Sequence, residues 1–227
     1  QRQMCIRDSN CGVEVFDRAD STEEFQAMFS VRGKALYTKM DFLFKMIGEI
    51  LNSSKLEDTK RLYEIVASVK SRAQVNLTGA GHSTAVLRAA AYSSPMAAFQ
   101  DEMAGIGYYQ FIEKLEKDFE QRKEETVEEL CKLMKKILRP ENFMISYTGE
   151  RESLETVQKL AGAVKAGLGT EPVEKSEEKL TCTKKNEGFK TSGQVQYVAQ
   201  TGNFKKKGLE YTGAVSYTHL TLPTILR

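Results

Sequence analysis

The sequence predicts an α+β fold in which helices are layered on a small, mostly antiparallel sheet. Residues 24–32, "EFQAMFSVR", alternate apolar and polar side chains, which is the period of a half-buried strand. From Leu36 to Leu168 most apolar residues recur every three or four positions, which is the period of amphipathic helices. Two further runs, "NFMISYTG" at 142–149 and "QVQYVAQ" at 194–200, predict additional strands. Strands interrupted by a block of helices are typical of the α+β class.

Periodicity and end signals place the helices. Ser94 and Pro95 mark one helix start, because serine accepts a hydrogen bond from a free N–H of the first turn and proline at the first helical position lacks an N–H. The sequence "TGAG" at 78–81 separates two helices, and "AGIG" at 104–107 loosens the chain again. We expect helices over residues 36–51, 58–77, 83–92, from 95 onward, 108–119, 123–138 and 154–168.

The range 123–138 gives the clearest helical pattern. Four glutamates lie early in it and three lysines late, which complements the helix dipole. Glu128 and Lys132 are four residues apart, with the glutamate first, so they can pair on the helix surface. Pro140 ends this helix. Residues 171–192 are polar, rich in lysine and glutamate, and poor in core residues, which predicts a linker.

The two ends of the chain carry an unusual relationship. Residues 1–9, "QRQMCIRDS", and residues 214–222, "AVSYTHLTL", can be encoded by the two complementary strands of one DNA sequence. We therefore expect residues 1–9 and 215–227 to derive from a sequencing adapter and exclude them from fold reasoning. Their exclusion removes three arginines and one aspartate, so the net charge falls from +2 to 0.

Composition limits the function classes. A net charge of zero leaves no argument for nucleic acid or an anionic membrane as a partner. No apolar run approaches the ~20 residues that a membrane span needs. Cys11, Cys131 and Cys182 remain after the exclusion; an odd, widely spaced set is no disulfide framework. We expect reduced thiols and a cytoplasmic location.

No residue of the chain forms a catalytic or metal site that the sequence supports. His82 has no second histidine or acidic residue at metal-ligand spacing, so we interpret it as structural, with a polar contact to a partner or neighbouring domain as the alternative. The motif "GIGYYQ" at 105–110 lacks the third glycine of a dinucleotide fingerprint and follows no strand, so we interpret its glycines as easing a helix junction. Glutamates at 124–129 predict a solvated helix face, and "KKK" at 205–207 predicts a solvated turn.

One segment resembles a known family. "GHSTAVLRAAAYSSPMAAFQDEMAGIGYYQFIEKL", residues 81–115, is similar to the insulinase-type (pitrilysin) zinc metallopeptidases of the presequence-protease branch, in their associated region. The resemblance extends over essentially all of residues 10–214. It implies a truncated LuxS/pitrilysin-like arrangement: residues 10–170 as the third of four related domains, incomplete at its N-terminus, 171–192 as the linker, and 193–214 as the start of the fourth.

The resemblance also implies a function. Family members close two halves around a peptide, and the inverted zinc motif H-x-x-E-H lies in the N-terminal half. That motif does not occur in this chain. The expectation is therefore the scaffold, non-zinc half of a zinc-dependent peptidase that degrades unfolded peptides in an enclosed chamber. Its partners would be peptide substrates and the missing catalytic half, and the chain alone would be inactive and bind no zinc. Two alternatives stay open: a non-catalytic homologous structural or partner subunit, and a free-standing helical interaction module.

Overall fold

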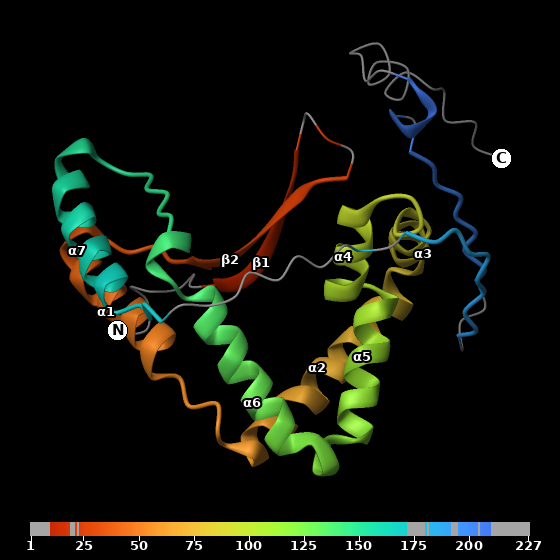
Figure 1. Ribbon diagram of the computed structural model, residues 1–227, viewed down its shortest axis with the longest axis horizontal. Coiled ribbons are helices and arrows are strands. Elements are labelled where there is room, and N and C mark those ends of the chain that lie inside the picture. Colours follow the sequence, from red (N-terminus) through yellow and green to blue (C-terminus); the bar gives the residue numbers. More distant parts are fainter. Residues whose placement is uncertain are drawn as a thin grey trace. The chain divides into compact units, whose positions relative to one another are not determined.

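The computed structural model describes residues 10–18, 21, 23–171, 180, 182–191, 195–203 and 205–209 (Figure 1). The residues that we attribute to an adapter, 1–9 and 215–227, lie outside this part, as do 172–179 of the expected linker and 210–214. The elements of the described part, in chain order, are β1 (Asn10–Asp17), β2 (Phe25–Arg32), α1 (Met40–Ser53), α2 (Thr59–Gly79), α3 (Gly81–Ala90), α4 (Pro95–Ala104), α5 (Ile106–Lys117), α6 (Phe119–Ile137) and α7 (Leu154–Ala166), with short 3₁₀ turns at Tyr37–Lys39, Pro140–Asn142, Arg151–Ser153 and Lys205–Lys207.

The α+β class is confirmed, with a smaller sheet than the sequence predicts. β1 and β2 pair in a two-stranded sheet, and the short connection between them permits only an antiparallel hairpin. Ser30 in β2 donates a hydrogen bond to the carbonyl of Gly12 in β1, and Arg32 pairs with Glu14 across the strands. The strand β1 was not predicted, although "VEVF" at 13–16 is rich in residues that favour strands.

The strand predicted at residues 142–149 is wrong. Asn142 ends a 3₁₀ turn, and residues 143–148 adopt no regular secondary structure. Met144 is 70% exposed and Ile145 is 45% exposed, so this apolar run lies at the surface. A strand needs a neighbour for its backbone groups, and the described sheet contains only β1 and β2. Residues 195–200, the described part of the other predicted strand, are likewise not in a strand, and position 194 lies outside the described residues.

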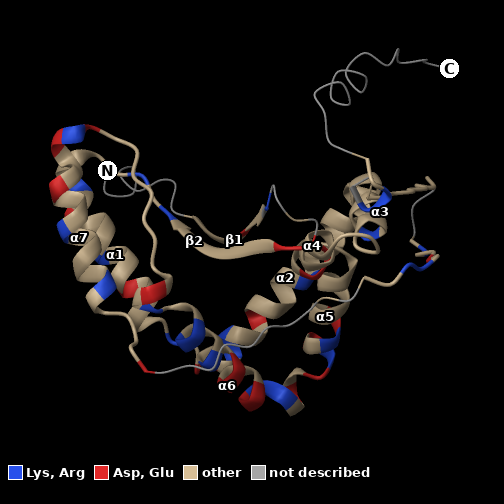
Figure 2. Ribbon diagram, turned by 45° about the horizontal axis from the view of Figure 1, so that its top comes forward, with Lys and Arg blue, Asp and Glu red and all other residues tan. Residues whose placement is uncertain are grey.

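The chain divides into two compact units. The first contains residues 27–72 and 110–171, together with the start of β1. In it α1 packs along α7, as Figures 1 and 2 both show. Met40 of α1 is buried, as are Val157, Ala161 and Val164 of α7. The same unit holds a second cluster, in which Tyr63 of α2 lies against Phe119 of α6, with 5.3 Å between ring centroids.

The second unit contains residues 73–109 and the described residues from 180 onward, with the hairpin segment around Phe25. α3 and α4 form its centre and pack against each other. Their contact uses small side chains, and Ala91 and Ala97 are buried there. Phe25 contacts Phe99 of α4, with ring centroids 5.2 Å apart. Alanine-rich helices can approach closely, as the sequence of residues 83–92 predicts.

Candidate functional site

The α3–α4 turn forms as the sequence predicts. Ser94 is the N-cap of α4, and its Oγ accepts a hydrogen bond from the backbone N–H of Ala97 at 3.4 Å. Pro95 occupies the first turn, where its missing N–H costs nothing. This turn fixes the end of α3 beside the start of α4, and it places the polar side chains of the two helices together.

Asp101 of α4 is the central polar group of this unit. Its side chain is almost fully buried, with 1% of the residue exposed. Oδ1 accepts a hydrogen bond from the N–H of Ile106 at 3.1 Å, and Oδ2 accepts one from the N–H of Gly107 at 3.1 Å. These are N–H groups of the first turn of α5, which have no partner within their own helix. Asp101 therefore supplies the acceptors that the first N–H groups of α5 need. Its negative charge also interacts favourably with the dipole of α5.

The glycines of "GIGYYQ" serve this arrangement. A Cβ on Gly105 would lie 2.9 Å from Cα of Asp101, and a Cβ on Gly107 would lie 2.9 Å from its Oδ2. Neither position has room for a side chain while Asp101 caps α5. The motif thus follows a helix, not a strand, and its tight backbone encloses an aspartate, which would repel the phosphates of a dinucleotide.

Arg88 of α3 pairs with Asp101 through Nη1, at 2.7 Å from Oδ2. The opposite edge of the guanidinium faces Glu187, with Nε 2.9 Å from Oε2 and Nη2 3.3 Å from Oε1. The hydroxyl of Tyr92 donates a further hydrogen bond to Oε2 of Glu187. The guanidinium carbon lies 5.8 Å from the centroid of the Phe189 ring. We call Arg88 and Tyr92 together the Arg88–Tyr92 clamp.

The clamp changes the acidity of its members. Hydrogen bonds from Arg88 and then from Tyr92 lower the pKa of Glu187. Burial and the hydrogen bond to Glu187 raise the pKa of Tyr92. Glu187 was not predicted as a functional residue, because residues 171–192 are polar and poor in core residues and so predict a linker. A single glutamate among many charged residues carries no pattern that distinguishes it.

We expect an acid-induced loss of the Glu187 contact. A lowered folded-state pKa means that the contact is fully formed above the ordinary glutamate pKa of about 4.3, and is lost as pH falls through the lower, folded-state value. The groups that act on this carboxylate are Arg88 on α3, Tyr92 in the turn after α3, and Lys185 on its own segment, while Asp101 on α4 pairs with another N–H of Arg88. An NMR titration of the Glu187 carboxyl carbon measures the midpoint. Tyr92→Phe should raise that midpoint, and an unchanged midpoint would contradict the contact.

His82 lies exposed at the start of α3 and has a ring neighbour, Tyr197, at 6.0 Å between centroids. A Cβ on Gly81 would lie 2.6 Å from the Tyr197 ring, so the glycine permits this close approach. His82 is thus in contact with a neighbouring segment and not part of the helical core. Among the described residues, no group of three or more His, Cys, Asp or Glu side chains could hold a metal ion.

We expect no stoichiometric zinc in the purified chain. A structural or catalytic zinc ion needs three or four protein ligands at fixed geometry, and the described histidine, His82, belongs to no group of three or more ligating side chains among the described residues. Elemental analysis after dialysis measures the zinc content. About one tightly held zinc per chain would contradict this expectation, and addition of a chelator before dialysis controls for zinc carried through purification.

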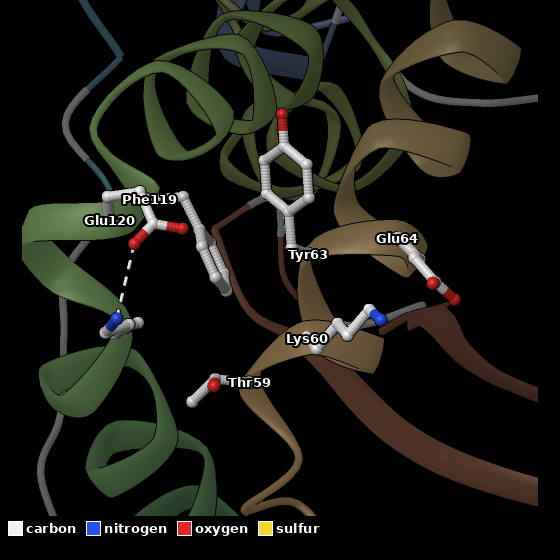
Figure 3. A pocket seen from close by; sticks show the side chains of 7 residues that line it. Thr59, Lys60, Tyr63, Glu64, Phe119 and Glu120 are labelled. Atoms are coloured by element: carbon white, nitrogen blue, oxygen red, sulfur yellow. Dashed lines mark hydrogen bonds and ion pairs between the residues drawn. The ribbon is translucent and has the colours of Figure 1, made fainter.

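A shallow pocket of about 300 Å³ lies in the first unit, between α2 and α6 (Figure 3). Tyr63 and Phe119 face each other from the two helices, and Lys60 and Glu64 lie on the α2 side. The remaining lining residues are Thr59, Glu120 and Lys123, the last two joined by an ion pair at 3.2 Å. Glu64 also pairs, with Arg61 at 2.7 Å, and the lining contains no histidine or cysteine, so it offers no residue pair typical of nucleophilic catalysis.

The remaining candidates lie on solvated surfaces. Glu125 pairs with Arg122 at 2.9 Å, and Glu128 pairs with Lys132 at 2.6 Å, as the spacing predicts. Figure 2 shows acidic and basic residues mixed along α6. The lysines at 205–207 form a 3₁₀ turn, in which Lys206 pairs with Glu23 at 2.7 Å.

Cys11, Cys131 and Cys182 are free thiols, and burial raises the pKa of Cys182.

Comparison with known proteins identifies the region that contains the clamp. Residues 9–115 match the family described as associated with the peptidases of family M16, subfamily C. They are a peptidase-associated region of this family. The matched part of the chain includes α3 and α4, and with them Arg88, Tyr92 and Asp101. The resemblance drawn from residues 81–115 is therefore confirmed.

Curated relatives extend the similarity beyond the peptidase-associated region. The chain is 31% identical over 205 residues to Protein HypA of Clostridium perfringens, and 26% identical over 210 residues to Presequence protease 1, chloroplastic/mitochondrial, of Arabidopsis thaliana. These alignments cover 90% and 89% of this chain, but 21% and 19% of the relatives. The mitochondrial Presequence protease of Yarrowia lipolytica is 28% identical over 97 residues, or 43% of the chain and 10% of the relative. The chain thus spans about a fifth of the length of the first two relatives.

Among the described helices, none is long and apolar enough to cross a membrane.

Proposed function

We propose that the chain is the non-zinc, scaffold part of a zinc-dependent peptidase that degrades unfolded peptides in an enclosed chamber. The observation that carries the proposal is the match of residues 9–115 to the peptidase-associated family. Similarity to a presequence protease over 210 residues supports it. In this proposal the partners are peptide substrates and a separate catalytic half, and the location is the cytoplasm.

The described residues do not fit a zinc ion, because they contain no cluster of ligating side chains. The proposal therefore assigns the water-activating chemistry to another part of the parent protein, and it gives this chain a supporting role. What the described residues do is structural: Asp101 holds the start of α5, and Arg88 links α3 to α4. In this proposal, these links hold α3, α4 and the start of α5 in one arrangement as part of the scaffold.

A second candidate is a non-catalytic homologue that serves as a structural or partner subunit. Of the two relatives that match most of the chain, one is named as a protease and the other, Protein HypA, is not. The two candidates make the same prediction for this chain alone, since neither places a catalytic group in it. They differ in the protein from which the chain comes.

The test has two arms. The purified chain should show no cleavage of a fluorogenic unfolded peptide above the buffer rate, with or without added zinc. A protein that joins this chain to the segment preceding it in its gene should cleave that peptide in a chelator-sensitive manner and should encode H-x-x-E-H. Cleavage by the chain alone would contradict the scaffold assignment. A longer protein that lacks both the motif and the activity would favour the non-catalytic subunit.

A further inference from the structure

The Arg88–Tyr92 clamp has the donor pattern of a carboxylate receptor. Two N–H groups on one edge of the Arg88 guanidinium face the two oxygens of Glu187, at 2.9 and 3.3 Å. A planar fork of this kind matches a carboxylate in both distance and direction. The Tyr92 hydroxyl adds a third donor to one of the same oxygens. Three donors therefore converge on one carboxylate.

The receptor half is fixed independently of its occupant. Nη1 of Arg88 is bound to Asp101, which is 1% exposed and is itself held by two N–H groups of α5. Arg88 lies near the end of α3, which packs on α4, and Tyr92 lies in the turn that joins these two helices. These contacts do not involve the segment that carries Glu187. Preorganised donors of this kind lose little side-chain freedom when a ligand binds.

The segment that carries the occupant, Glu187, is in contrast not part of any regular secondary structure. Residues 182–190 form neither helix nor strand, and all of them except Cys182 are exposed at the surface. Phe189 is 46% exposed although its ring lies near the Arg88 guanidinium. A segment without secondary structure opens more readily than the helices on which it rests. The contact thus joins a rigid receptor to an exchangeable ligand.

We infer that the Arg88–Tyr92 clamp is a binding site for acidic peptides, which Glu187 of the same chain fills as a resident ligand. The ligand class follows from the occupant: an extended peptide with a carboxylate side chain and an aromatic ring two residues later, as in "NEGF" at residues 186–189. When the segment that carries Glu187 detaches from the clamp, a peptide of this class binds there instead. The site is independent of the proposed peptidase activity, because it needs only α3, α4, the turn between them and the start of α5.

The test uses the full chain and two short peptides, NEGF and NQGF, both acetylated and amidated so that only the side chain differs in charge. The substitution Glu187→Gln removes the negative charge that occupies the clamp. Because residue 187 is exposed, the variant should retain the fold. NMR titration of the Arg88 Nε–H signal measures binding. We expect the Glu187→Gln variant to bind NEGF about tenfold more tightly than NQGF. A tenfold difference in affinity is at the lower end of the range for hydrogen bonds to charged groups, and we expect this end because the site is partly exposed.

Two controls make the result decisive. The unchanged chain should bind NEGF about tenfold more weakly than Glu187→Gln does, because its own carboxylate competes. Adding Tyr92→Phe to Glu187→Gln should weaken NEGF binding more than NQGF binding, since the lost hydrogen bond is stronger to a carboxylate than to an amide oxygen. Equal affinity for the two peptides, or equal affinity of the unchanged chain and Glu187→Gln for NEGF, would overturn the inference. Acetate binding as tightly as NEGF would overturn its peptide part.

Discussion

Replacing Asp101 with alanine should lower the free energy of unfolding by about 3 kcal/mol, at the lower end of the range for breaking a buried ion pair, because Arg88 is partly exposed. The loss has two sources. The N–H groups of Ile106 and Gly107 lose their acceptor, and Arg88 loses its partner on α4. Since α5 also loses the negative charge at its first turn, its start should fray.

Two comparisons identify the cause of that loss. Asp101→Asn keeps the shape and one oxygen acceptor, so it should cost about half as much, in the range of about 1–2 kcal/mol for a charged hydrogen bond that becomes neutral. Glu102→Ala, at the exposed neighbouring position, should change stability by less than about 0.5 kcal/mol. Urea denaturation followed by helical circular dichroism measures all three. If Asp101→Ala were no more destabilising than Glu102→Ala, Asp101 would not hold the α4–α5 junction.

Local chemistry explains why some features could be predicted from the sequence. Ser94 and Pro95 specify a helix start by themselves, and Glu128 and Lys132 pair because four residues make one turn. The break between α2 and α3 lies at Gly79 and Gly81, because glycine is unfavourable in a helix interior and so marks a helix end. In each case the interacting groups lie within a few positions along the chain, so their spacing contains the information.

The features that the sequence did not predict depend on distant partners. Residues 142–149 are apolar enough for a strand, but a strand forms only where another strand pairs with it. Arg88 and Glu187 are 99 positions apart, so no periodicity connects them. Asp101 lies in an ordinary helical sequence, and only the bend at Gly105 turns the N-terminus of α5 toward its carboxylate. The glycines at 105 and 107 could therefore be interpreted from the sequence as a helix junction, but the aspartate that they enclose could not.

Replacing Phe119 with alanine should lower the free energy of unfolding by about 3–5 kcal/mol, the usual cost of removing a buried aromatic side chain and leaving a cavity. Phe119 is 1% exposed and is the largest fully buried side chain in the part of the chain that the structure describes. It lies between α2 and α6 and contacts the Tyr63 ring, so its loss removes the packing that joins these helices.

Phe111 offers a matched control, because the same chemical change at a residue that is 60% exposed should cost no more than about 0.5 kcal/mol. Urea denaturation of Phe119→Ala and Phe111→Ala compares a buried position with an exposed one, because the substitution is the same in both variants. A small effect of Phe119→Ala would mean that the second cluster of the first unit does not contribute to stability. A large effect of Phe111→Ala would mean that this face of α5 is covered in solution. The expected ratio between the two losses therefore tests the position of the core as well as the contribution of one ring.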